Sequence, residues 1–167
     1  FVGRQGPNSL GYTLDYETLG LKGSYNTISP SFASAAASPL SLFKFYAAEG
    51  GMRVPMIVAG PGVQGVGDVN HAFSFVTDIA PTLLTLAGLT APEGRYGGRP
   101  VAPMIGRDLT PLLRGEVERA YQPDDTIGYE LAGHAALFQG DYKILYTRGP
   151  LGDGQWHLYD IVRDPGE

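Results

Sequence analysis

The sequence predicts an α/β chain that ends in a small α+β part with a four-stranded antiparallel sheet. The run Val54–Ala59 is short, apolar and bounded by turn residues, which is typical of a strand buried on both faces. Residues 78–87 carry a helical apolar pattern, and after Pro123 the hydrophobic period changes to two. Apolar residues make up 43% of the 167 residues, enough to build a core and too many for a disordered chain.

The first part of the chain is expected to be loop-rich. Residues 1–40 have no sustained period, and the stretch SPSFASAAASP is interpreted as an extended covering loop. A short helix is predicted over residues 41–49, with Ser41 as its N-cap and the Gly50-Gly51 pair as its stop. This helix would place Lys44 among apolar side chains.

The second part has clearer signals. A helix is expected after Asp78 as N-cap, with Leu83, Leu84 and Leu86 on its apolar face and Gly88 as its stop. Residues 108–114 predict a second short helix. Four strands then follow, in TIGYELA, AALFQ, YKILYT and WHLYDI, with Gly140-Asp141 as a hairpin turn between the second and the third. Both faces of YKILYT carry large apolar groups, so we expect one face to take a helix and the other to need the main domain.

Composition excludes several classes of function. The net charge is −5 with no basic stripe, which argues against a nucleic-acid partner. No apolar run approaches the ~20 residues of a membrane span. The chain has no Cys, so a thiolate nucleophile or a Cys zinc site is excluded within these residues. The compartment stays open, and a bacterial periplasm and cytoplasm are both compatible.

Lys44 is the leading candidate for a functional residue. A Lys inside an apolar helix loses hydration and needs an anionic partner, so it is either a fixed cation for a sulfate, phosphate or carboxylate, or a surface Lys whose stem covers apolar neighbours. Glu49 and Arg53 flank the glycine pair and are expected to form an ion pair. His71, His134 and His157 lack metal-ligand spacing, so no metal site is predicted. The pair Asp124-Asp125 is interpreted as a solvated loop.

Four blocks in the same order resemble the sulfatases of the alkaline phosphatase superfamily. They are KFYAAEGGMRVP from Lys44, TDIAPTLLTLAG, GRDLTPLLRGE, and QGDYKILY followed by LYDIVRDPGE. Together they cover roughly residues 40–167, and the approach HAFSF is most similar to bacterial arylsulfatases. The resemblance implies the C-terminal part of a sulfatase-like fold. Residues 1–122 would then be the end of the main α/β domain, and 123–167 a small C-terminal antiparallel-sheet subdomain.

The resemblance also implies roles for individual residues. Lys44 would contact the substrate sulfate, Glu49 and Arg53 would be structural supports, and His134 would lie at the rim of the substrate pocket. The parent would be a sulfuric ester hydrolase that uses a formylglycine and Ca²⁺, both supplied by a missing N-terminal part. Its ligand would be a sulfate-ester small molecule.

The chain also departs from the family pattern. The motif C/S-x-P-S/T-R is mimicked by ISPSF, but Ile28 stands at the nucleophile position and Phe32 replaces the arginine. Ala135 stands where an arginine often precedes the hairpin. The chain alone is therefore expected to be inactive. A phosphoester or phosphonate monoester hydrolase of the same superfamily, and a non-catalytic binding module, remain as alternatives.

Overall fold

The computed structural model describes residues 10–26, 28–65 and 67–167. The chain divides into two compact units that interleave along the sequence. Unit 1 comprises residues 1–54, 129–136 and 144–167, and unit 2 comprises residues 55–128 and 137–143. Among the described residues, no helix is long and apolar enough to cross a bilayer.

Unit 1 begins with two helical segments where a loop was expected. A 3-10 turn, η2, spans Tyr16–Thr18, and the α-helix α1 spans Pro30–Ala37. The prediction of an extended loop over SPSFASAAASP was therefore wrong. Pro30 occupies the first turn of α1, where its missing N–H is tolerated, and the alanines that follow favour helix more than any other residue.

The helix expected over residues 41–49 is absent, because the backbone there cannot be helical. Leu42 and Phe45 both have positive φ, at +60° and +84°. A four-residue helix, α2, instead spans Glu49–Met52, so it begins where the predicted helix was to end. The glycine pair lies inside α2 and does not stop it.

The apolar run Val54–Ala59 does not form the predicted strand. It has no regular secondary structure and is exposed, and Ile57 has 94% of its surface accessible. A doubly buried strand needs neighbours on both sides, and no strand pairs with this run in the described part of the chain.

Unit 2 contains the helices that were predicted most clearly. A 3-10 turn, η3 (Val76–Asp78), leads into α3 (Ile79–Leu86), and α4 spans Thr110–Leu113. Gly88 stops α3 at φ +71°, and the N–H of Leu89 donates to the carbonyl of Leu84 at 2.8 Å. The expected apolar face is not buried, however. Leu83 and Leu86 are exposed, whereas Pro81 and Thr82 are buried. A two-stranded hairpin that was not predicted pairs β1 (Arg95–Tyr96) with β2 (Arg99–Pro100).

The carboxylate of Asp78 holds three segments of unit 2 together. It is fully buried and accepts the N–H of Phe75 at 2.7 Å, the N–H of Arg107 at 2.8 Å and the hydroxyl of Tyr121 at 2.6 Å. Burial and the hydrogen bond to Asp78 raise the pKa of Tyr121 above its usual value, so the hydroxyl remains a donor. Asp78 stands at the N-cap position of α3 as predicted, but its side chain does not cap the helix.

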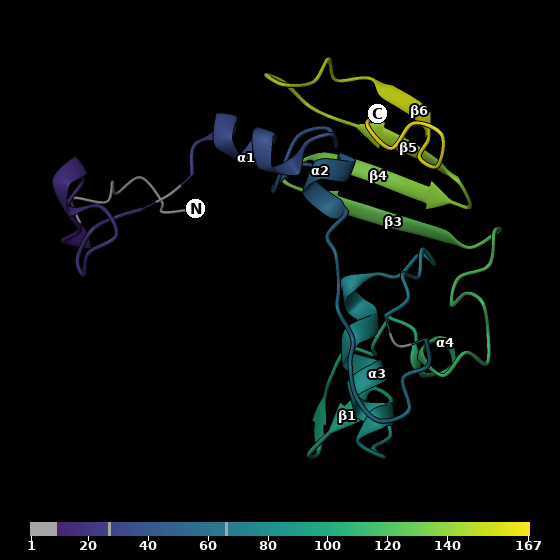
Figure 1. Cartoon of the computed structure of the whole chain (residues 1–167). Helices are drawn as coiled ribbons and strands as arrows, with labels where there is room; N and C mark the ends of the chain where they lie inside the picture. Colours follow the sequence, from purple (N-terminus) through teal and green to yellow (C-terminus); the bar gives the residue numbers. More distant parts are fainter. Residues whose placement is uncertain (1–9, 27, 66) are drawn as a thin grey trace. The chain divides into compact units, whose positions relative to one another are not determined.

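The four-stranded sheet was predicted correctly. It contains β3 (Thr126–Leu131), β4 (His134–Gln139), β5 (Tyr142–Tyr146) and β6 (Trp156–Asp160), in sequential order (Figure 1). Gly140 has φ +56° in the β4–β5 turn, as the hairpin prediction required. Side chains alternate along β5, where Lys143 and Leu145 are buried and Tyr142 is exposed.

Candidate functional site

Lys44 lies in the loop that precedes α2, in unit 1. Its side chain is exposed, and its Nζ lies 5.4 Å from the centroid of the Phe45 ring. The expected helix around Lys44 was therefore wrong, and the exposure of Lys44 agrees with the alternative of a surface lysine. What the structure shows is an exposed ammonium group with an aromatic neighbour, held on a loop rather than on a helix.

The glycine pair determines how closely this loop wraps around α2. A Cβ on Gly50 would collide with the carbonyl oxygen of Leu42, and a Cβ on Gly51 would collide with that of Tyr46. The N–H of Gly50 also donates to the carbonyl of Ser41 at 2.8 Å. The spacing from Lys44 to the glycines therefore has a physical cause, because only glycine lets the loop pack this tightly onto α2.

Glu49 and Arg53 form the ion pair that the sequence predicted. Arg53 Nε lies 2.7 Å from Glu49 Oε2, one turn apart, and the Glu49 side chain is almost completely buried. Arg53 also donates through Nη2 to the carbonyl of Ile161 at 3.4 Å. The pair thus connects α2 to the segment that follows β6.

A second connection joins the same two segments. The N–H of Glu49 donates to Oε2 of Glu167 at 2.8 Å. Two of the sequence blocks, the one from Lys44 to Pro55 and the one that ends at Glu167, therefore meet in unit 1. The sequence did not predict this contact, since nothing in either block reveals its partner.

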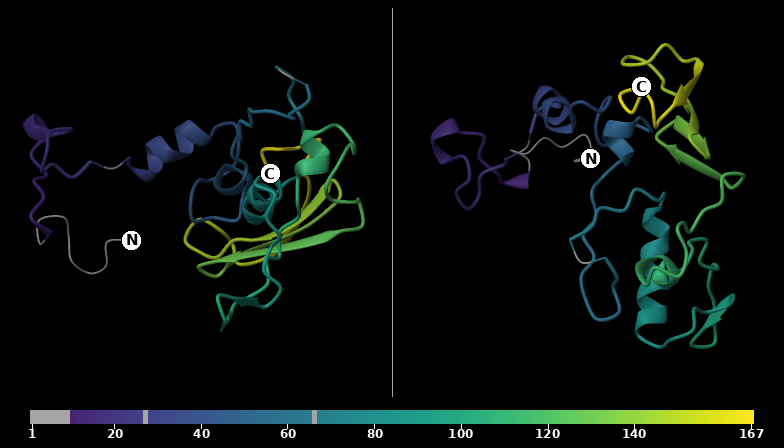
Figure 2. Two further views of the ribbon diagram at one scale, coloured as in Figure 1. Left: turned by 90° about the horizontal axis from the view of Figure 1, so that it is seen from below. Right: turned by 45° about the vertical axis from the view of Figure 1, so that its right-hand side comes forward.

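His134 begins β4, a strand of the four-stranded sheet (Figures 1 and 2), and contacts Tyr46 in the loop that precedes α2. Its ring is 4.7 Å from that of Tyr46, and only 8% of the residue is accessible. Burial lowers the pKa of His134, and the charge of Arg148 lowers it further. Nδ1 of His134 has no hydrogen-bond partner among the described residues. Lys44, Glu49, Arg53 and His134 therefore all lie in unit 1.

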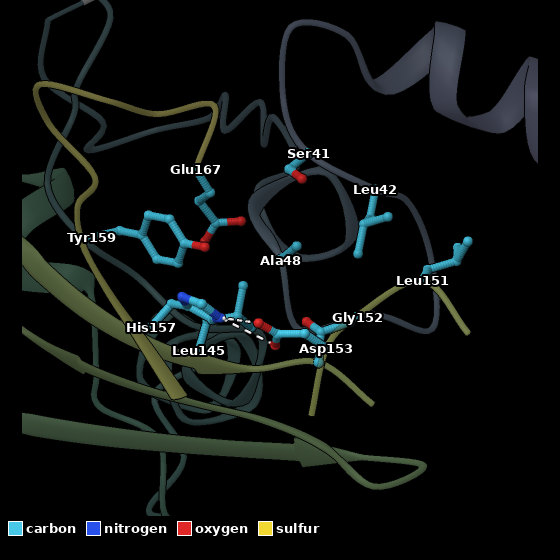
Figure 3. Close-up of a pocket in the computed structure, with 11 residues that line it drawn as sticks. Ser41, Leu42, Ala48, Leu145, Leu151, Gly152, Asp153, His157, Tyr159 and Glu167 are labelled. Atoms are coloured by element: carbon cyan, nitrogen blue, oxygen red, sulfur yellow. Dashed lines mark hydrogen bonds and ion pairs between the residues drawn. The ribbon is translucent and has the colours of Figure 1, made fainter. Parts of the chain in front are cut away.

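A cavity of about 220 Å³ in unit 1 adds residues that sequence reasoning did not select (Figure 3). His157 Nε2 lies 3.0 Å from Oδ2 of Asp153, and Tyr159 and Glu167 line the same cavity. Burial, with Glu167 as the main charge, raises the pKa of the Tyr159 hydroxyl. The alternation of WHLYDI could have placed His157 and Tyr159 on one face, but the approach of Asp153 depends on the loop before β6.

The described residues do not form a metal site. They contain no group of three or more His, Cys, Asp or Glu side chains able to hold a metal ion. Asp125, interpreted from the sequence as a solvated acid, is instead paired with Arg107 in unit 2. No cluster within the described part of the chain therefore fits the calcium ion that the resemblance implies for the parent.

Comparisons with known proteins identify the chain's relatives. Residues 42–167 match the model of the family described as N-sulphoglucosamine sulphohydrolase, C-terminal. An uncharacterized sulfatase of Schizosaccharomyces pombe is 33% identical over 152 residues, which is 90% of this chain and 27% of the relative. An arylsulfatase of Klebsiella aerogenes is 33% identical over 98 residues, which is 58% of this chain and 21% of the relative.

Solved structures support the same fold. A structure from work on glycosaminoglycan metabolism by Bacteroides thetaiotaomicron has a TM-score of 0.56 and 22% sequence identity. The match covers 74% of this chain and 26% of the other. The chain thus spans only about a quarter of the length of the relatives that it matches. With four sequence blocks in order, the four-stranded sheet and the family match in agreement, the chain belongs to the sulfatase family and corresponds to its C-terminal portion.

Proposed function

We propose that this chain is the C-terminal part of an enzyme that hydrolyses sulfate esters, and that Lys44 contacts the sulfate group of the substrate. The observation that carries the proposal is the exposed ammonium of Lys44 on a loop held by the glycine pair. A sulfate ester carries negative charge on its non-bridging oxygens, and more charge develops on the leaving oxygen as the ester bond breaks. A fixed cation at this position would stabilise that charge.

The surrounding residues support the loop. The Glu49–Arg53 ion pair and the bond from Glu49 to Glu167 fix α2, on which the loop packs, so these residues act on Lys44 through the backbone. We propose that His134 lies at the rim of the substrate pocket, next to Tyr46. The nucleophile, derived as formylglycine, and Ca²⁺ would come from the rest of the parent protein.

The test uses the full-length parent. Lys44→Ala should lower kcat/KM for an aryl sulfate by roughly a hundredfold or more, the scale of losing one charge-stabilising donor. Lys22→Ala, which removes an exposed lysine from a turn elsewhere in unit 1, is the matched control and should leave the rate unchanged. A wild-type rate in Lys44→Ala would remove Lys44 from the mechanism.

Hydrolysis of phosphate esters is the alternative reaction within this superfamily. The relatives of this chain named above are sulfatases, so the comparisons do not favour it. Parallel assays with 4-nitrophenyl sulfate and 4-nitrophenyl phosphate distinguish the two reactions. Faster turnover of the phosphate would overturn the proposed substrate class.

A further inference from the structure

A second cation of unit 1 lies beside His134. Arg148 follows β5 by two residues, and its side chain crosses the turn between β3 and β4. Its Nη1 lies 3.0 Å, and its Cδ 3.2 Å, from the position that a Cβ on Gly133 would occupy. Gly133 has φ +81°, so the absence of a side chain at this turn both permits the backbone conformation and leaves room for the guanidinium.

The guanidinium of Arg148 is not neutralised within the described part of the chain. The carboxylate of Glu130, which precedes the same turn, accepts the N–H of Gly133 at 2.8 Å and forms no ion pair with Arg148. The side chain of Arg148 is exposed. An Arg with its planar fork of donors facing solvent is suited to bind an oxyanion through two parallel hydrogen bonds.

The environment of His134 strengthens this assignment. Its pKa is lowered by burial and by the charge of Arg148, so at neutral pH the ring carries no charge that would compete for an anion. Arg148 is therefore a permanent cation beside the neutral ring of His134.

Lys44 and Arg148 are both connected to the contact between the Tyr46 and His134 rings. The centroids of the Tyr46 and His134 rings are 4.7 Å apart, and the charge of Arg148 acts on His134. Lys44 is two residues before Tyr46, so its backbone lies within roughly 7 Å of that of Tyr46. Two exposed cations from separate segments thus lie near the Tyr46–His134 contact, in a chain whose net charge is −5.

We propose that Arg148 binds a second anionic group of the substrate, a carboxylate or a further sulfate, while Lys44 binds the sulfate that is cleaved. The inference rests on the proposed function of Lys44 and assigns the substrate class, which is a sulfate ester that carries at least two negative charges. Arg148 is a specificity-determining residue in this scheme and takes no part in bond cleavage.

The experiment measures binding by the full-length parent, using calorimetry with sulfonates that cannot be hydrolysed. Benzenesulfonate carries one anionic group, and the 1,2-, 1,3- and 1,4-benzenedisulfonates carry two at different separations. At least one disulfonate should bind the wild type roughly tenfold or more tightly than the monosulfonate, the scale of one added charge-assisted hydrogen bond.

The variants assign that preference to a residue. Arg148→Gln should reduce the ratio of disulfonate to monosulfonate affinity to about one, and Arg148→Lys should restore part of it through its point charge. Arg163→Gln, at an exposed arginine after β6 that pairs with Asp160 at 3.5 Å, should keep the wild-type ratio.

Two results would overturn the inference: a wild-type protein that binds all four sulfonates equally, or an Arg148→Gln protein that keeps its preference. The calorimetry measures binding without hydrolysis, so a failure of the proposed function would be detected by a different experiment. That failure would be the absence of 4-nitrophenyl sulfate hydrolysis by the wild type.

Discussion

At the scale of single residues, the loop that carries Lys44 shows what sequence reasoning can reach. The Glu49–Arg53 ion pair followed from their spacing, and the structure confirms it. The surroundings of Lys44 could not be predicted from the sequence. The positive φ values of Leu42 and Phe45 arise where this loop packs against the glycines of α2. Apolar residues at adjacent positions favour a helix only when the backbone is free to adopt one.

Gly50 provides a direct test of this packing. Gly50→Ala should destabilise the protein by roughly 1–3 kcal/mol, because the new Cβ meets backbone carbonyls that cannot rotate away. Chemical denaturation of the variant and the wild type measures the difference. The matched control is Gly128→Ala in β3, where a Cβ lies 3.7 Å from Leu137 Cδ1, an ordinary contact. Equal stability of both variants would show that the loop does not wrap tightly around α2.

His134 links stability to pH. Its pKa in the folded protein is lower than its ordinary value of 6.5, so the unfolded chain binds the proton more tightly. The contribution of the neutral ring is fully present above pH 6.5 and is lost as the pH falls toward the lower, folded pKa. The unfolding free energy should therefore fall below pH 6.5, and less steeply in His134→Gln. Identical pH profiles for the two proteins would contradict this account.

At the scale of elements, the sheet and α3 were predictable and the partners of their side chains were not. Period-two patterning and the Gly140 turn located β3 to β6, since each signal is local. Leu83 and Leu86 are exposed although we expected them to be buried. An amphipathic pattern shows which face of a helix is apolar, but it does not show whether a neighbouring element covers that face. Asp78 looked like a helix cap and proved to be the junction of three segments, which no local pattern indicates.

The hydrogen bonds that Asp78 accepts predict the effect of removing the Tyr121 hydroxyl group. Tyr121→Phe takes away a hydrogen bond to the fully buried carboxylate of Asp78 and should destabilise the protein by about 1.5–3 kcal/mol, the range for bonds to charged groups. Thermal unfolding measures the change. Tyr96→Phe, at an exposed residue of β1, is the control and should have the stability of the wild type. If both variants melt alike, the bond from Tyr121 contributes nothing.

At the scale of the whole molecule, the family is recognisable from the sequence alone, because four blocks in a fixed order are more specific than any single element. The division between residues 1–122 and 123–167 stays a prediction. Large apolar side chains remain exposed on β6, among them Trp156 and Leu158, and the Trp156 ring lies 5.5 Å from that of Tyr146. These side chains form an exposed apolar patch on the sheet in unit 1.

This patch predicts that the 167-residue chain associates in solution. Leu158→Lys should weaken self-association by replacing a 68% exposed leucine in the patch with a charge. Sedimentation at several protein concentrations measures the change in the dissociation constant. The control is Leu21→Lys, at a similarly exposed leucine that belongs to none of the four strands. Association that is unchanged in Leu158→Lys, or weakened equally in both variants, would place the contact elsewhere.

The bond from Glu49 to Glu167 has a consequence for biosynthesis. Its donor and acceptor are separated by 118 residues, and Arg53 reaches Ile161 across 108. A ribosome delivers the chain from its N-terminal end, so the loop with Lys44 emerges long before the carboxylate and the carbonyl that secure α2. Contacts of such long range form late because closing the intervening loop is entropically costly. The loop that carries Lys44 is therefore secured only after Ile161 and Glu167 have been synthesised, and this part of unit 1 should complete its fold well after the loop itself has emerged.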